Sequence, residues 1–214
     1  MEKMYCISGL GADQRIFKRL SIKGIELVPL SWPPYDKHDE VSCYAQKISA
    51  LIPDETPMIL GLSFGGMLAV EIAKQRATKR IFLISSAKTQ YELPKPSGLL
   101  KTLIKSNILP SGIFTMRSSF IYHAFGAETD DEKKLLSDIL KDTDGHFMKW
   151  AFKALMSWHN TTFPDNIIHI HGTADKIIPP QNVKPNYWIE GGQHIMVYNR
   201  ADEINKLIAA NLNG

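Results

Sequence analysis

Short, almost wholly apolar runs recur toward both ends of the chain, and longer stretches of mixed character separate them. Runs of about four to eight apolar residues predict strands that are buried on both faces, as in a parallel sheet. On this pattern we expect strands over residues 4–7, 26–30, 57–60, 79–86, 166–170 and 187–189.

The stretches between these runs carry apolar residues at helical spacing. In residues 36–51, Val41, Tyr44 and Ile48 recur at intervals of three or four, which places them on one face of a helix. Further helices are expected over residues 13–20, 67–75 and 199–212. Strands that alternate with helices need crossover connections. The pattern therefore predicts an α/β fold with a mostly parallel sheet and helices on both faces.

The alternation stops after the fourth run, and residues 88–165, here called the helical block, contain no run that predicts a strand. Helices are expected there over residues 99–104, 114–125, 129–140 and 144–158. We therefore divide the chain into a core of residues 1–87 and 166–214 and a helical insertion. The block either packs on its own small core or forms a lid over a pocket, because ligands bind beyond the carboxyl ends of parallel strands.

The composition limits the classes of protein to which this chain can belong. The 214 residues suffice for one domain with a sizeable core, and 44% hydrophobic with 22% charged residues is typical of a globular protein. The net charge of +3 without a dense basic run gives no indication of a nucleic-acid partner. Cys6 and Cys43 are expected to be free thiols. With no signal-peptide pattern and no segment able to span a bilayer, we expect a cytoplasmic protein without membrane insertion.

The most informative stretch runs from Gly61 to Gly66 and reads Gly-Leu-Ser-Phe-Gly-Gly. It joins a predicted strand to a predicted helix, so Ser63 lies at a sharp turn where glycines relieve close approaches. Such a turn exposes the serine hydroxyl next to a helix N-terminus, which favours a nucleophile. The alternative is a glycine-rich turn in which the serine has no chemical role.

Two further residues complete a possible catalytic set. Asp175 and His194 each follow a predicted strand, so all three side chains are expected at one edge of a parallel sheet. A serine hydroxyl needs a base to become a nucleophile, and His194 can supply it. Asp175 can hold the imidazole in the correct tautomer. Its alternative is a residue of a surface loop.

The other histidines are weaker candidates for the base. We interpret His169, inside a strand, as a core residue, and His171 as a brace for the loop of Asp175. His159, near the end of the helical block, is an alternative residue for the pocket wall. His38, His123 and His146 are expected to be ordinary surface or helix residues.

Four segments together resemble the α/β-hydrolase superfamily, in particular a small serine hydrolase with a helical lid. They are residues 8–11 (Ser-Gly-Leu-Gly), residues 61–66, residues 171–179 (His-Gly-Thr-Ala-Asp-Lys-Ile-Ile-Pro) and residues 191–194 (Gly-Gly-Gln-His). The order nucleophile, acid, histidine also agrees with this family. The resemblance implies an oxyanion hole formed by the backbone N–H groups of Leu10 and Phe64.

This chain departs from the family in two places. It has Ser8-Gly9 where members often have His-Gly, which bears on the shape of the oxyanion loop. It also begins directly at the strand before that loop, without the two leading antiparallel strands of larger members. We therefore expect a sheet of about six strands.

The resemblance implies a serine hydrolase that cleaves a small, largely apolar ester or thioester through an acyl-enzyme on Ser63. Alternatives are the same residues acting on an amide, a lactone or a carbon–carbon bond, or a ligand-binding protein without turnover. The sequence shows no metal-ligand spacing, no phosphate loop and no dinucleotide fingerprint. We therefore expect neither a metal nor a cofactor.

Overall fold

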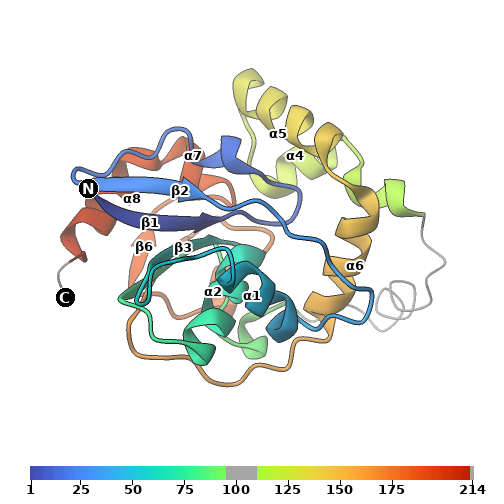
Figure 1. The fold of residues 1–214 in the computed structure, drawn as a ribbon. Coiled ribbons are helices and arrows are strands. Elements are labelled where there is room, and N and C mark those ends of the chain that lie inside the picture. The colour runs from blue at the N-terminus through green and yellow to red at the C-terminus, as the bar shows by residue number, and fades with distance from the viewer. Residues whose placement is uncertain (95–109, 213–214) are drawn as a thin grey trace.

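The structure is a computed structural model that describes residues 1–94 and 110–212. Within these residues, six strands form one sheet in the order β2-β1-β3-β4-β5-β6, and every neighbouring pair is parallel. The strands are β1 (Glu2–Ile7), β2 (Ile25–Pro29), β3 (Met58–Leu62), β4 (Arg80–Ile84), β5 (Ile167–Gly172) and β6 (Tyr187–Ile189). Every strand expected from the apolar runs is present, which confirms the predicted parallel α/β sheet (Figure 1).

Helices connect and cover these strands. The α-helices in the described part of the chain are α1 (Val41–Ser49), α2 (Phe64–Gln75), α4 (Ser119–Phe125), α5 (Asp130–Asp142), α6 (Gly145–Met156), α7 (Met196–Asn199) and α8 (Ala201–Ala210). Short 3₁₀ helices are η1 (Gln14–Phe17), η2 (Gln90–Glu92), η3 (Ser111–Thr115) and η4 (Pro180–Asn182). None of the described helices combines the length and apolar character needed to cross a bilayer.

The sheet is buried on both faces because its side chains alternate between two clusters. On β1, Tyr5 and Ile7 pack with α1, α2 and α6, whereas Met4 and Cys6 pack with η1 and α8. The near-continuous apolar strands of the sequence follow directly from this two-sided burial.

Two predicted helices differ from the structure at their starts. The helix expected over residues 36–51 begins only at Val41, because the carboxylate of Asp39 accepts hydrogen bonds from the N–H of Asp36 and from Lys47 Nζ in a turn. The helix expected over residues 114–125 is divided into η3 and α4, and Ser118 caps α4 through the N–H of Ile121. The helix expected over residues 99–104 lies outside the described residues.

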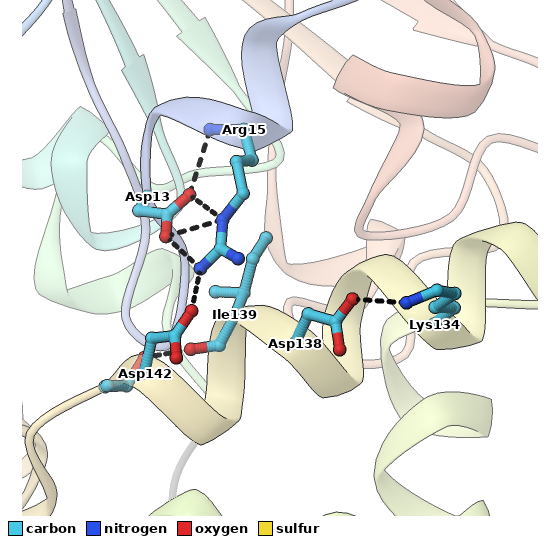
Figure 2. A network of polar contacts seen from close by, with 7 residues as sticks. Asp13, Arg15, Lys134, Asp138, Ile139 and Asp142 are labelled. Carbon is cyan, nitrogen blue, oxygen red and sulfur yellow. Dashed lines mark hydrogen bonds and ion pairs between the residues drawn. The ribbon is translucent and has the colours of Figure 1, made fainter.

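The helical block is attached to the core at several points. Trp150 Nε1 of α6 donates to the carbonyl of Asp39 at 3.2 Å, and its ring lies 4.6 Å from that of Tyr44 between centroids. At the end of α5, Asp142 Oδ2 lies 2.9 Å from Nη2 of Arg15, whose guanidinium also binds Asp13 (Figure 2). Part of the block is therefore a structural layer on the core.

Candidate active site

The turn between β3 and α2 has the geometry that its sequence predicts. Ser63 adopts φ +52° and ψ −121°, a conformation that residues with a Cβ rarely occupy. A Cβ at Gly65 would lie 2.2 Å from the carbonyl oxygen of Ile7, and one at Gly61 would lie 2.4 Å from Gly66 Cα. The glycines are required because the turn brings three segments of backbone into contact.

Ser63, His194 and Asp175 meet at the edge of the sheet. His194 Nε2 lies 3.0 Å from Ser63 Oγ, and His194 Nδ1 lies 2.8 Å from Asp175 Oδ2. The three residues follow β3, β6 and β5, so the carboxyl ends of these strands bring them together. Asp175 is 2% exposed and His194 3% exposed. These distances are the ones that a nucleophile, its base and a residue that orients the base would require.

Asp175 is held in place as an ionised acceptor. Its Oδ1 accepts hydrogen bonds from the N–H groups of Ile177 and Ile178, both at 2.9 Å. Burial alone would raise the pKa of this carboxyl group. The charge and hydrogen bond of His194, with the N–H of Ile178, outweigh burial, so the pKa lies below its usual value.

His171 lies behind the acid. Its Nε2 is 2.9 Å from the carbonyl oxygen of Ile178 and 3.6 Å from Asp175 Oδ2, so it braces the loop as predicted. Burial lowers the pKa of His171, and Asp175 offsets part of this effect. His169 is fully buried on β5, and its ring lies 5.3 Å from that of His171 between centroids. His159, the alternative residue for the pocket wall, instead lines a separate pocket together with Glu71.

The two residues predicted to supply the oxyanion donors line the same cavity as Ser63. Phe64 is the first residue of α2, so its N–H has no acceptor within the helix. Leu10 lies in the loop after β1, where Ser8 Oγ donates to the carbonyl of Ala12 at 2.9 Å. Ser8, the departure from the family pattern, therefore closes this loop from within.

One contact at the site was missed by the sequence interpretation. Ser86 Oγ, just after β4, donates to the carbonyl oxygen of Ser63 at 2.6 Å. The bond joins the strained turn to the neighbouring strand and helps to hold Ser63 in place. A serine that follows a strand gives no sequence signal for such a role.

A cavity of about 430 Å³ opens beside Ser63 and His194. The core contributes Leu10, Phe64, Met67, Ile177 and Ile178, and the helical block contributes Leu93, Pro94, Phe114, Met116, Phe120, Ile121, Ala124, Phe125, Leu140, Met148, Phe152 and Leu155. Lys176 also lines the cavity, and its Nζ lies 3.0 Å from Nε2 of His123 on α4. The cavity is thus largely apolar.

Not every large apolar residue of the helical block faces this cavity. Phe114, Phe125 and Phe152 do, whereas Phe147 and Trp150 pack into the core cluster. Trp158 is also buried in that cluster, and its Nε1 donates to Glu71 Oε1 at 2.8 Å. Trp158 lies just beyond the end of α6 and is not among the described residues that line this cavity.

Known structures share this arrangement of elements. The enol-lactonase from Burkholderia xenovorans matches with a TM-score of 0.77 and 16% sequence identity, over 100% of this chain and 92% of that chain. The chain has the α/β-hydrolase fold. Two further proteins with the α/β-hydrolase fold extend the comparison. An esterase from Exiguobacterium antarcticum matches with a TM-score of 0.70 and 13% identity, over 100% of this chain and 92% of that chain.

The second is a thioesterase of the prodiginine biosynthetic pathway from Streptomyces coelicolor. It matches with a TM-score of 0.67 and 15% identity, over 98% of this chain and 90% of that chain. No protein-family model matches the chain, and no curated protein matches it in sequence. Identities this low are informative about the α/β-hydrolase fold, and function has to be argued from the site itself.

Proposed function

We propose that this protein is a serine hydrolase that cleaves a small, largely apolar carboxylic ester or thioester through an acyl-enzyme. The observation that carries the proposal is the continuous hydrogen-bonded series from Ser63 Oγ through His194 to Asp175, at the mouth of an apolar cavity. A protein that only bound a ligand would have no need of all three side chains in this geometry.

In the first step, Ser63 Oγ attacks the carbonyl carbon of the substrate and its proton passes to His194 Nε2. The carbonyl oxygen becomes an oxyanion, for which the N–H groups of Leu10 and Phe64 are the proposed donors. Each such donor contributes on the order of 3 kcal/mol to the transition state. Asp175 remains ionised and stabilises the imidazolium of His194.

In the second step, the bond from the carbonyl carbon to the leaving oxygen or sulfur breaks, and His194 gives its proton to the leaving group. The acyl group stays bound to Ser63 as an ester. A water molecule then attacks the acyl carbon and gives one proton to His194, and the bond from this carbon to Ser63 Oγ breaks, which releases the carboxylic acid. Ser63 recovers its proton from His194, which closes the cycle.

The cavity supports an apolar substrate. Each methylene group that enters it from water contributes about 0.8 kcal/mol to binding. Much of the wall comes from α4 and α6, so we further propose that the helical block, residues 88–165, acts as a lid that selects the substrate. The ring of Phe125 on α4 also lies beside the proposed base, 5.5 Å from the ring of His194 between centroids and at 79° to it.

The proposal is tested with a panel of p-nitrophenyl esters, acyl-CoA thioesters and lactones. We expect saturable hydrolysis of esters or thioesters by the wild type. In Ser63→Ala, turnover should fall by several orders of magnitude with an unchanged melting temperature. Ser157→Ala, at an exposed serine after α6, is the matched control and should retain activity. Activity of Ser63→Ala within about tenfold of the wild type would exclude this residue as nucleophile.

A further inference from the structure

Ser63 and His194 border a second space besides the large cavity. This small pocket has a volume of about 20 Å³, against about 430 Å³ for the large cavity. Leu10 and Phe125 also border both spaces. The attacking oxygen therefore lies between a roomy apolar space and a very small one.

The size and lining of the small pocket limit what it can hold. A volume of about 10 to 15 Å³ on this scale is enough for one water molecule, so about 20 Å³ has room for one or two carbon atoms. Its walls are formed by backbone around Gly9 and by apolar side chains such as Ile16, Leu136 and Ile139. A buried water needs two to four polar partners. Ser63 and His194 are the only polar side chains among the described residues that line it, so once a substrate carbonyl occupies these two groups the remaining lining suits a methyl or ethyl group better than a water molecule.

The outer wall of the small pocket is held in place. Ile139 and Leu136 project from α5 and are 1% and 4% exposed. Figure 2 shows the side chain of Ile139 extending toward the segment that carries Asp13 and Arg15, on the same helix as Asp142. Arg15 binds both carboxylates and so connects α5 to the loop that follows β1, while the burial of Ile139 and Leu136 holds this wall in place. Because this wall is held in place, the small volume limits the size of the substrate group that can enter the pocket.

We propose that the substrate is strongly asymmetric about the scissile bond, with a one- or two-carbon group on one side and a longer apolar chain on the other. This inference rests on the proposed function, because it assumes that Ser63 attacks a carbonyl group placed between the two spaces. Two substrate types have this shape. One is the methyl or ethyl ester of a longer acid, and the other is an acetyl or propionyl ester of a longer alcohol.

Two ester series distinguish these types and test the size limit. The first series is methyl, ethyl, propyl and butyl octanoate, and the second is octyl acetate, propionate, butyrate and pentanoate. In one series we expect kcat/KM to fall steeply once the short group exceeds two carbons, by about tenfold or more for each added methylene. The series that shows the fall identifies which side of the ester enters the small pocket.

Variants on α5 connect the limit to this pocket. Ile139→Ala removes a wall side chain and should extend the accepted short group to three or four carbons, and Ile139→Val is a milder variant of the same wall. Leu135→Ala is the matched control, because Leu135 lies on the same helix and is also buried but does not line the small pocket. It should leave the limit where it is in the wild type.

Labelling by a fluorophosphonate separates the failure of this inference from the failure of the proposed function. If Ser63 is labelled but both series are flat, the small pocket is only a packing void and the inference is wrong. A limit that moves equally in Ile139→Ala and Leu135→Ala would also overturn it. If the protein is not labelled and hydrolyses no ester, the proposed function itself fails.

Discussion

At the scale of single residues, the site depends on the hydrogen bonds that the buried carboxylate of Asp175 accepts. Its carboxylate accepts hydrogen bonds from Ile177 N–H, Ile178 N–H and His194 Nδ1, with no exposed oxygen to solvate. A buried carboxylate with these partners keeps its negative charge and fixes the imidazole. His171 is near enough to add a further favourable interaction, at 3.6 Å from Oδ2, but its Nε2 is directed at the carbonyl of Ile178.

We predict that Asp175→Asn lowers turnover by roughly 10³ to 10⁴-fold with little change in substrate binding. The amide has nearly the same shape, but its NH₂ group would favour the wrong tautomer of His194. Steady-state kinetics on the best ester of the panel measures the effect. Asp165→Asn, which changes a carboxylate that precedes β5, is the control and should retain full turnover. Equal losses in the two variants would contradict the role of Asp175.

The two buried histidines of β5 predict how stability depends on pH. Burial, with the nearby His171 and Lys88, lowers the pKa of His169 well below its usual value. The unfolded chain therefore binds the proton more readily than the folded one. The free energy of unfolding should fall as the pH drops below about 6.5. Asp175, whose pKa in the folded protein is lowered from 3.8, causes a further loss of unfolding free energy only at more acidic pH.

In His169→Gln this dependence should be weaker between about pH 5 and 6.5, because one of the two histidines no longer titrates. Urea unfolding across that range measures the slope of the unfolding free energy against pH. A uniform change in the stability of the variant does not affect this slope. An identical slope in wild type and variant would show that His169 takes up a proton in the folded protein as readily as in the unfolded chain.

Sequence reasoning located the candidate triad because each member lies in a local motif at a strand end. It could not locate Ser86 or the contact between Lys176 and His123, since these join segments far apart in the chain. Side chains that only support a site are not part of a recognisable sequence motif. Their roles follow from packing, which only the folded structure defines.

At the scale of elements, α6 has two apolar faces, one packed on the core and one lining the cavity beside Ser63. Phe147 and Trp150 pack on the aromatic residues of the core, and their rings contact Trp32 and Tyr44 respectively. Phe152 lines the cavity beside Ser63 and contacts Phe114 in a tilted arrangement, with ring centroids 5.3 Å apart. The hydrophobic pattern predicted this helix. It could not divide the apolar residues between core and cavity, because both surroundings select the same side chains.

We predict that Phe152→Ala changes the preferred length of the substrate's longer apolar chain and that Trp158→Ala does not. Removing the Phe152 ring enlarges the cavity, so the optimum should shift toward longer or bulkier chains. Trp158→Ala instead creates a cavity in the core and removes a hydrogen bond from Glu71, at a cost of about 3 to 5 kcal/mol of stability. A chain-length series and urea unfolding of both variants provide the test. An identical preference in Phe152→Ala and wild type would assign selection to another wall.

At the scale of the whole molecule, the helical block is attached to the core by aromatic packing and by a few polar bridges. Arg15 connects Asp13 in the core to Asp142 on α5, and the side chains of Arg15 and Asp142 are 35% and 59% exposed. An ion pair this open to water contributes about 0 to 1 kcal/mol to global stability. Its effect should therefore be local.

We predict that Arg15→Gln leaves the free energy of unfolding within about 1 kcal/mol of the wild type and increases hydrogen exchange at the end of α5. Lys134→Gln removes another ion pair of α5, with Asp138, that does not reach the core. It serves as the control and should not change exchange of the same amides. Unchanged exchange in Arg15→Gln would show that packing alone holds α5 against the core.

The overall architecture was predicted from the sequence more completely than the individual helices or the contacts at the site. Alternating apolar runs and helices give a parallel sheet because few chain paths bury such strands on both faces. Whether the helical block opens as a lid depends on small differences between packed states, and such differences leave no periodic signal in the sequence.

The central claim is that Ser63 is a nucleophile activated by His194. Its most direct measurement is the mass of the intact protein after treatment with a fluorophosphonate, followed by peptide mapping. The account predicts one adduct, on the peptide that contains Ser63, with no labelling of Ser63→Ala and much slower labelling of His194→Ala. An unlabelled wild type, or an adduct that persists in Ser63→Ala, would contradict it.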